Sequence, residues 1–154
     1  MKRVLLLGTG PAALQLAVIL KKGFHCHLGI AGRASVRSAD FFESLAASDQ
    51  RVRVSIQNVK HLAMEGECRL DEVYRGFEAI EGQWDTLILA VTTDAYMEVM
   101  RQIDQDVLRK INSLVLISPT FGSNSLIAGF IRQFNPAAEV ISFSTYIGDT
   151  RWVD

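Results

Sequence analysis

The feature that most constrains the fold is a glycine-rich turn between an apolar segment and a helical one at the start of the chain. Residues 4–7 form an apolar run of strand length, and residues 8–13 follow at once with the pattern G-x-G-x-x-A. A largely apolar stretch of helical length then runs to Lys21 and Lys22, and Gly23 is a typical helix stop. This order of strand, glycine turn and helix is that of a dinucleotide-binding βαβ unit.

Each small residue of this turn has its own role in such a unit. Gly8 permits the tight turn off the strand, Gly10 lets the backbone approach a pyrophosphate, and Ala13 lets the helix lie close to the strand. The unsatisfied N–H groups at the helix start favour an anion. The alternative is a glycine turn with a purely structural role, but the strand and helix signals around it favour nucleotide binding. The predicted cofactor contacts in this turn are Gly8, Thr9, Gly10, Pro11 and Ala12.

The segment after the expected second strand, residues 25–31, indicates which dinucleotide is bound. NAD-binding units carry an acidic residue about 20 positions past the glycine turn, where it binds the ribose 2′-hydroxyl. This chain has no Asp or Glu there before Asp40, and Arg33 could hold a phosphate in a fork. The alternative is that the arginines here are solvated loop residues. We predict an NADP(H) site with Arg33, Ser35 and Arg37, and the missing acid also argues against an S-adenosylmethionine site.

The composition is that of an ordinary globular domain. The 154 residues include 16 Lys plus Arg and 17 Asp plus Glu, so the charge balance does not predict binding to nucleic acid or to a membrane surface. No apolar run reaches the ~18–20 residues of a transmembrane helix, and the N-terminus does not resemble a signal peptide. Cys26 and Cys68 lack disulfide-framework spacing, so we expect reduced thiols in a cytoplasmic protein. His25 and His27 have no third ligand nearby, so no metal site is predicted.

The rest of the chain alternates expected strands and helices. Strands are expected at residues 51–56, 84–91, 113–117 and 139–144, and helical patterns at residues 38–48, 96–103, 106–110 and 127–134. A hairpin insertion about Glu65 and Gly66 is expected to interrupt this rhythm over residues 61–76. We therefore predict a Rossmann-like α/β fold: a doubly wound, mostly parallel sheet of about six strands in the order 3-2-1-4-5-6.

Polar residues after the later strands are further candidates for a ligand crevice, because the carboxyl ends of parallel strands meet at one edge of the sheet. Thr92 and Thr93 are candidates for the ribose–nicotinamide side, although helix capping explains them equally well. Pro119, in the turn after the fifth strand, is a further predicted cofactor contact. Asp149 follows the last strand, where it could act as a general acid/base or orient a substrate amine. Spacing alone favours a surface pair between Asp149 and Arg151.

Five stretches of the chain are distinctive together: LLLGTGPAALQLA, AGRAS, LILAVTTDAYMEV, LVLISPTFGS and EVISFSTYIGDTR. With them the chain resembles the N-terminal half of the opine metallophore dehydrogenases, the family of staphylopine dehydrogenase. The resemblance implies that an α-keto acid, pyruvate or 2-oxoglutarate, condenses with a histidine-derived aminobutyrate. NADPH then reduces the imine to a staphylopine-like metal chelator used in metal acquisition. It places the family's phosphate loop on residues 8–12, its 2′-phosphate arginine on Arg33 and a catalytic acid/base on Asp149.

The same resemblance implies that residues 1–154 are the NADP-binding domain of a larger oxidoreductase. The family's C-terminal domain, which lies outside this chain, supplies most of the substrate pocket and a catalytic histidine. The expected partners are therefore the keto acid, the amine, that C-terminal domain and, in the full enzyme, a second copy in a homodimer. The alternatives are a two-domain NADP-dependent reductase of the octopine or ketopantoate type and a free-standing NADP(H)-sensing module.

Overall fold

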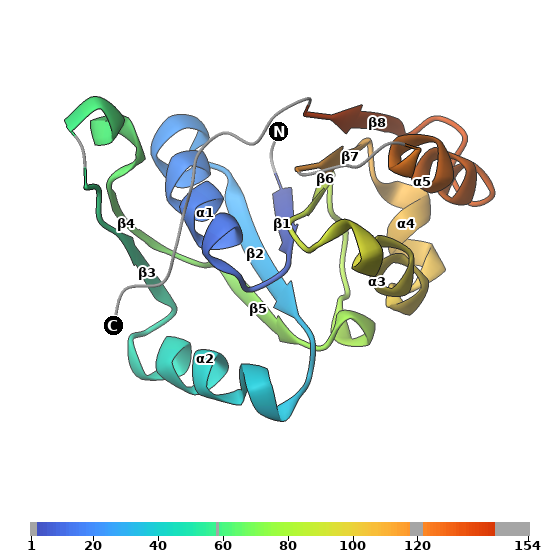
Figure 1. The fold of residues 1–154 in the computed structure, drawn as a ribbon. Helices are drawn as coiled ribbons and strands as arrows, with labels where there is room; N and C mark the ends of the chain where they lie inside the picture. Colours follow the sequence, from blue (N-terminus) through green and yellow to red (C-terminus); the bar gives the residue numbers. More distant parts are fainter. Residues whose placement is uncertain (1–2, 58, 118–121, 144–154) are drawn as a thin grey trace.

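The structure is a computed structural model that describes residues 3–57, 59–117 and 122–143 (Figure 1). The strands within these residues are β1 (Arg3–Leu7), β2 (His27–Gly32), β3 (Arg51–Val54), β4 (Gly66–Arg69), β5 (Glu72–Arg75), β6 (Thr86–Leu89), β7 (Ser113–Leu116) and β8 (Glu139–Ser142). The α-helices are α1 (Pro11–Phe24), α2 (Val36–Ala47), α3 (Tyr96–Gln102), α4 (Gln105–Lys110) and α5 (Ser123–Arg132). Short 3-10 helices are η1 (Val59–Met64), η2 (Phe77–Ala79) and η3 (Thr93–Ala95).

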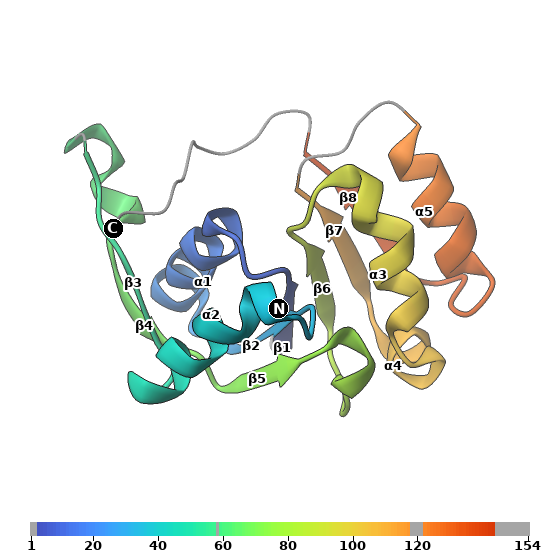
Figure 2. The same cartoon turned by 60° about the horizontal axis from the view of Figure 1, so that its bottom comes forward.

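Six of these strands form one parallel sheet in the order β5-β2-β1-β6-β7-β8. Helices α1 and α2 cover one face of the sheet, and α3, α4 and α5 cover the other (Figures 1 and 2). The chain builds outward from β1 first on the β2 side and then on the β6 side, which is the doubly wound arrangement. The predicted Rossmann-like fold with a parallel sheet of six strands is therefore confirmed.

Strand β1 lies in the middle of the sheet and is buried on both faces. Val4, Leu5, Leu6 and Leu7 have no exposed surface. Val4 and Leu6 belong to the core that α1 covers, whereas Leu5 and Leu7 belong to the core under α3 and α4. A strand with a core on each side has no polar face, which is why this segment reads as a continuous apolar run.

The identity of the third strand in the sheet was predicted wrongly. Residues 51–56 were expected beside β2, but β3 pairs antiparallel with β4 in a separate two-stranded sheet that packs on α1. The place beside β2 is taken by β5. The expected hairpin over residues 61–76 is also differently built, because η1 precedes the turn and β4 pairs with β3 instead.

The side chains of the two segments explain this exchange. Strand β3 alternates arginines with Val52 and Val54, so it offers one apolar face, and that face packs into the core around α1. Strand β5 offers apolar groups on both sides: Val73 packs against the α1 core and Tyr74 against the α3 core. When helices cover both faces of a sheet, each of its strands, an edge strand such as β5 included, needs apolar groups on both sides. Strand β5 has them and β3 does not.

The boundary between α1 and β2 also differs from the prediction. Helix α1 continues through Gly23 to Phe24, and His25 ends it in the left-handed conformation with φ 50°. Strand β2 then begins at His27, so His25 is not part of the strand. Histidine is among the non-glycine residues that tolerate this conformation, which is why the glycine was not needed as the stop.

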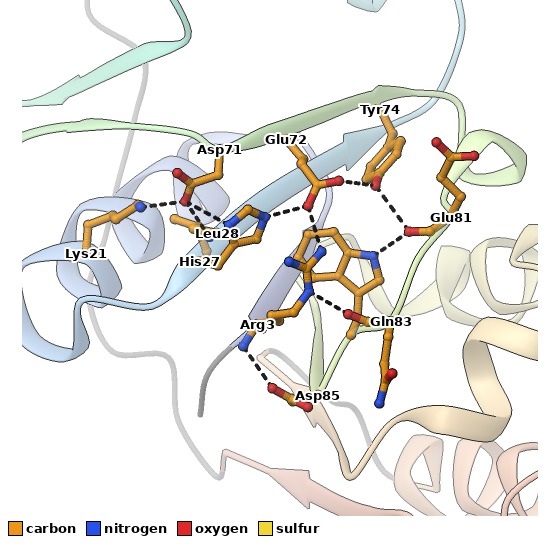
Figure 3. Close-up of polar contacts among 11 residues, drawn as sticks. Arg3, Lys21, His27, Leu28, Asp71, Glu72, Tyr74, Glu81, Gln83 and Asp85 are labelled. Carbon is orange, nitrogen blue, oxygen red and sulfur yellow. Dashed lines mark hydrogen bonds and ion pairs between the residues drawn. The ribbon is translucent and has the colours of Figure 1, made fainter.

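A cluster of polar contacts at the amino-terminal edge of the sheet attaches β5 to its neighbours (Figure 3). Asp71, just before β5, accepts hydrogen bonds from Lys21 Nζ at 2.5 Å and from the backbone N–H of Leu28 at 2.8 Å. These two contacts join β5 to both α1 and β2. Because Leu28 lies in a strand and Lys21 in a helix, Asp71 fixes the position of β5 against both elements at once.

Glu72 makes a second set of contacts one residue later (Figure 3). Its Oε2 accepts hydrogen bonds from Arg3 Nη2 at 2.9 Å and from His27 Nε2 at 2.5 Å, and its Oε1 accepts one from the Tyr74 hydroxyl at 2.8 Å. The Arg3 guanidinium also lies over the ring of Trp84, 4.7 Å from its centroid. This carboxylate therefore connects the edge strand β5 with β2 and with β1.

Both carboxyl groups are held in their charged form. Partial burial raises the pKa of Asp71, but the hydrogen bonds from Lys21 and Leu28 outweigh it, so the pKa lies below its ordinary value. Burial likewise raises the pKa of Glu72, and hydrogen bonds from His27 and Tyr74 with the charge of Arg3 bring it below its ordinary value. The contacts therefore stabilise the fold most where both groups are ionised.

Gly29→Ala tests the close packing at the centre of β2. A Cβ on Gly29 would lie 2.6 Å from Trp84 Cη2 and 3.0 Å from Leu5 Cδ1, and both side chains are fully buried. We expect this variant to lose about 1–3 kcal/mol of unfolding free energy, because the core has to shift to admit the methyl group. Urea denaturation measures the loss.

The matched control for Gly29→Ala is Gly129→Ala in α5, where no described atom outside the helix's own backbone lies within 4 Å of the added Cβ. There alanine should leave the unfolding free energy unchanged or raise it by up to about 1 kcal/mol, because alanine favours the helix over glycine. Equal effects of the two substitutions would contradict the packing argument.

Asp71→Asn tests the carboxylate that attaches β5. At pH 7 we expect the variant to be about 1–3 kcal/mol less stable, because charge-assisted hydrogen bonds from Lys21 and Leu28 are weakened. The pKa of Asp71 is lower in the folded state than the unfolded value of 3.8, so its contribution is present above that value and is lost as the pH falls through the folded pKa. The stability difference should therefore shrink between pH 7 and about pH 3.

Urea denaturation at both pH values measures the effect of Asp71→Asn. Asp40→Asn, on an exposed part of α2 without an ion pair to any described residue, should change the unfolding free energy by less than about 0.5 kcal/mol at either pH. A pH-independent difference for Asp71→Asn would show that the loss is steric and not electrostatic.

Candidate functional site

The site predicted from the sequence lies at the carboxyl-terminal edge of the sheet, where β1 ends between β2 and β6. This is the point at which the chain changes direction across the sheet, and ligands bind there in folds of this kind. The backbone N–H of Gly8 donates to the carbonyl of Ala31 at 2.8 Å, and the N–H of Ala90 donates to the carbonyl of Leu7 at 2.9 Å. The glycine turn is thus held by both neighbouring strands.

The first two glycines of the turn differ in what the fold requires of them. Gly8 has φ +132°, and a Cβ there would lie 2.5 Å from the carbonyl oxygen of Ala90, so the fold itself demands glycine. Gly10 is extended, with φ −76° and ψ 174°, and no atom of the residues that the structure describes would lie within 4 Å of a Cβ there. Any residue could adopt the backbone of Gly10, so the packing of the described residues does not explain this glycine.

Helix α1 starts from this open position. Gly10 is its N-cap and provides no side-chain hydrogen bond, Pro11 occupies the first turn, and that turn carries no acidic residue. Ala13 is fully buried and lets the helix approach the sheet. The first N–H groups of a 14-residue helix therefore face the open position beside Gly10, with the positive end of the helix dipole behind them. This arrangement suits an anion.

The end of β2 packs against this turn through Gly32 and Thr9. A Cβ on Gly32 would collide with the side-chain methyl of Thr9 and would lie 3.1 Å from Cζ of Phe42. Gly32 is therefore needed so that the glycine turn and α2 can both lie against the end of β2. This role of Gly32 has no local signal in the sequence, because it depends on contacts between three elements.

Arg33, Ser35 and Arg37 follow β2 as predicted, but they have different surroundings. Arg33 is exposed and its Nη2 lies 3.4 Å from Oε2 of Glu98 on α3. The Ser35 hydroxyl caps α2 and accepts from the N–H of Ser38 at 3.3 Å. Arg37 is exposed in the first turn of α2, and among the described residues no carboxylate lies within 4 Å of its guanidinium. Two arginines, Arg33 and Arg37, thus lie at the start of α2.

The structure adds a third cation that the sequence analysis did not include. Arg75 is the last residue of β5 and stands opposite Gly32 in the register between β5 and β2. It was missed because residues 73–76 were expected to continue a hairpin and not to enter the main sheet. No local signal could have placed it here, since its position follows from which strand pairs with β2.

Thr92 and Thr93 lie beyond β6 on the other side of the turn. Thr92 is exposed and precedes η3 without a side-chain cap, so the capping role that the sequence left open for it is not seen. Thr93 and Tyr96 line one side of a hollow of about 600 Å³, and Ser123 and Leu126 of α5 line the other side. The hollow lies between η3 and the first turns of α5, and η3 begins four residues after β6 ends at Leu89.

Two predicted site residues, Pro119 and Asp149, lie outside the described residues. Within residues 3–57, 59–117 and 122–143, no group of three or more His, Cys, Asp or Glu side chains could hold a metal ion. No helix in the same part of the chain has the length and apolarity to cross a membrane.

The two cysteines are buried free thiols and take no part in this edge of the sheet. Burial raises the pKa of Cys26, and it raises the pKa of Cys68 to about 11. A thiol with such a pKa stays protonated near neutral pH and is a poor nucleophile. Cys68 therefore acts as a small apolar side chain.

Comparison with known proteins identifies the family of the chain. The family model described as staphylopine dehydrogenase matches residues 2–154. The chain is 36% identical to staphylopine synthase of Staphylococcus aureus over an alignment of 156 positions. This alignment covers 100% of this chain and 36% of that protein. It is 30% identical to yersinopine synthase of Yersinia pestis, covering 97% of this chain and 33% of that protein. The chain thus spans about a third of the length of these relatives.

Solved structures give the same result. A yersinopine dehydrogenase with NADP⁺ bound superposes with a TM-score of 0.87 at 30% identity, covering 99% of this chain and 37% of that one. An octopine dehydrogenase with NADH and L-arginine has a TM-score of 0.76 at 17% identity over 100% of this chain and 38% of that one, which shows a shared fold. The resemblance found in the sequence is confirmed: the chain belongs to the staphylopine dehydrogenase family.

Proposed function

We propose that this chain binds NADP(H) at the carboxyl-terminal edge of β1 and is the cofactor-binding part of an opine metallophore dehydrogenase. The relatives named as staphylopine, yersinopine and pseudopaline synthases support this proposal, and so does the NADP⁺ in the yersinopine dehydrogenase structure. Of the alternatives, the octopine type is represented by an octopine dehydrogenase that is 17% identical to the chain, below the 30–36% of these synthases.

The observation that carries the proposal is the open position at Gly10. A position keeps a residue without a Cβ either because the protein fills the space beside it or because a ligand needs that space. At Gly10 no atom of the described part of the chain fills it. The N-terminus of α1 faces the same space with N–H groups that its N-cap residue, Gly10, cannot cap because it has no side chain. A pyrophosphate close to the backbone explains both features, because it needs a residue without a Cβ and a set of N–H donors.

The charges at the end of β2 favour the phosphorylated dinucleotide. Arg33 stands where NAD-binding units carry an acid, and a guanidinium there attracts the 2′-phosphate of NADP(H). Its contact with Glu98 is long, at 3.4 Å, and both side chains are more than half exposed, so this pair adds little stability. Exchange of Glu98 for a dianionic phosphate therefore costs little and gains charge-assisted hydrogen bonds.

The chemistry follows from the family to which the chain belongs. Bound NADPH would supply the hydride that reduces an imine formed from an α-keto acid and an amino-acid-derived amine. In this arrangement α1 holds the pyrophosphate, Arg33 holds the adenosine end, and Thr92 and Thr93 lie toward the ribose–nicotinamide end. Asp149 remains the proposed acid/base and Pro119 a proposed cofactor contact. The remaining two thirds of the enzyme would provide the substrate pocket, a catalytic histidine and the contacts of a homodimer, and would select pyruvate or 2-oxoglutarate.

Gly10→Ala tests whether glycine is needed at this position to bind a ligand or to maintain the fold. The added methyl group meets no atom of the described residues, so the unfolding free energy should change by less than about 1 kcal/mol. Calorimetric titration with NADPH should show an affinity about tenfold weaker or worse, because the methyl group occupies the place of the pyrophosphate.

Gly8→Ala is the control for Gly10→Ala, because alanine at Gly8 has both a strained φ and a clash with Ala90. It should lower the unfolding free energy by more than Gly10→Ala does. If Gly10→Ala binds NADPH as tightly as the unchanged chain, the proposed position of the pyrophosphate is wrong.

Arg33→Ala tests the preference for the phosphorylated cofactor. We expect the affinity for NADPH to fall about tenfold or more and the affinity for NADH to stay within about twofold, because the lost contact is to the 2′-phosphate. Arg53→Ala is the matched control, since Arg53 is an exposed arginine of the separate β3–β4 sheet and its loss changes the net charge equally. Equal affinities for NADPH and NADH in the unchanged chain would refute the proposed cofactor preference.

A further inference from the structure

We propose that Arg75 is a second ligand of the cofactor's 2′-phosphate and sets the preference for NADPH together with Arg33. This inference rests on the proposed function, because it assigns a further residue to the adenosine end of the same site. Four observations carry it: the register of β5, a hydrogen bond at its end, the stacking of Arg75 on Phe42, and the lack of a partner carboxylate among the described residues.

The register between β5 and β2 brings Arg75 to the adenosine end of the site. Arg75 is paired with Gly32, and Arg33 is the next residue after Gly32. The two arginines therefore leave neighbouring strands at the same edge of the sheet. Because β5 is parallel to β2, this placement is a property of the fold and does not depend on the conformation of either side chain.

A backbone hydrogen bond holds the end of β5 in this position. The N–H of Gly76 donates to the carbonyl of Gly32 at 2.7 Å. Gly76 has φ +109°, and the chain turns there into η2. The last residue of β5 is therefore fixed against the last residue of β2, so the Cα of Arg75 has little freedom to move away from the site.

The side chain of Arg75 is oriented by an aromatic ring of α2. Its guanidinium carbon lies 5.7 Å from the ring centroid of Phe42, which is buried and also contacts the end of β2 at Gly32. Stacking on a ring face leaves the edge of a guanidinium, with its N–H groups, available to a ligand. Arg75 is exposed, so these N–H groups can be reached from solvent.

The charge of Arg75 is not neutralised within the described part of the chain. No carboxylate there lies within 4 Å of its guanidinium; the Glu78 carboxylate, three residues on, packs against the Cα side of Gly76 without pairing with Arg75. Arg33, in contrast, reaches Glu98 on α3. Since α2 and α3 lie on opposite faces of the sheet, Arg75 and Arg33 approach the same edge from two sides.

A dianionic phosphate monoester at this edge fits these two cations. Each guanidinium could direct a pair of N–H groups at the phosphate oxygens, and the two together match its charge. A 2′-hydroxyl, as in NADH, offers no negative charge to either arginine. The arrangement therefore predicts that Arg75 contributes to binding of NADPH and leaves binding of NADH almost unchanged.

The test is calorimetric titration of the 154-residue chain with NADPH and with NADH. Arg75→Met keeps an unbranched apolar side chain against Phe42 but removes the charge, and Arg75→Lys keeps the charge but removes the fork. Arg53→Ala in β3 controls for the change in net charge. We expect Arg75→Met to weaken NADPH binding about five- to thirtyfold with NADH within about twofold, and Arg75→Lys to lie between Arg75→Met and the unchanged chain. Thermal unfolding confirms that each variant is folded.

The outcomes distinguish this inference from the proposed function. If the unchanged chain prefers NADPH and Arg75→Met keeps the same preference, the inference is overturned and the proposed function stands. If Arg75→Met lowers the affinity for both cofactors as much as Arg53→Ala does, the effect comes from the change in net charge, and the inference is overturned as well. If the unchanged chain binds neither cofactor, the proposed function fails and the inference fails with it. If it binds NADPH and NADH equally, the proposed cofactor preference and the inference are both overturned.

Discussion

The structure depends on the burial of β1 on both of its faces. A strand with no exposed surface must have both backbone edges paired, so β2 lies on one side and β6 on the other. The chain that leaves β1 therefore turns between two neighbours, and Gly8 is held against both, by a hydrogen bond to Ala31 and by contact with Ala90. The open position at Gly10 follows from this turn, because α1 can start only beyond it. The candidate site is thus a direct consequence of how the central strand is packed.

Strand β5 connects the stability of the fold with the chemistry of the site. Its four residues, Glu72 to Arg75, place a carboxylate at one edge of the sheet and a guanidinium at the other. The carboxylate, with the neighbouring Asp71, is held by groups from β1, β2 and α1. The guanidinium lies beside the end of β2. In this arrangement the polar cluster at the amino-terminal edge keeps the strand in register, and the register determines what Arg75 faces.

Sequence patterns predicted the parts of the site that are local in the chain. A strand, a glycine turn and a helix follow one another within about 20 residues, and Arg33 lies at the end of the next strand, so their spacing alone brought them together. The third strand could not be predicted in this way. Residues 51–54 and 72–75 are both short segments with Val and Arg, and the choice between them depends on whether both faces are apolar after pairing. The position of Arg75 depends on that pairing as well.

By itself, the sequence determined the fold class, the order of strands around β1, the glycine turn and the missing acid after β2, because each depends on residues close together in the chain. It also carried the family resemblance through stretches that run from residue 5 to residue 151. The tertiary structure decided which segment joins β2, which glycine the fold requires and which one it leaves open, and which arginines share one edge. These features depend on packing between elements distant in sequence, and that packing is set by the burial of whole strand faces and not by local propensity.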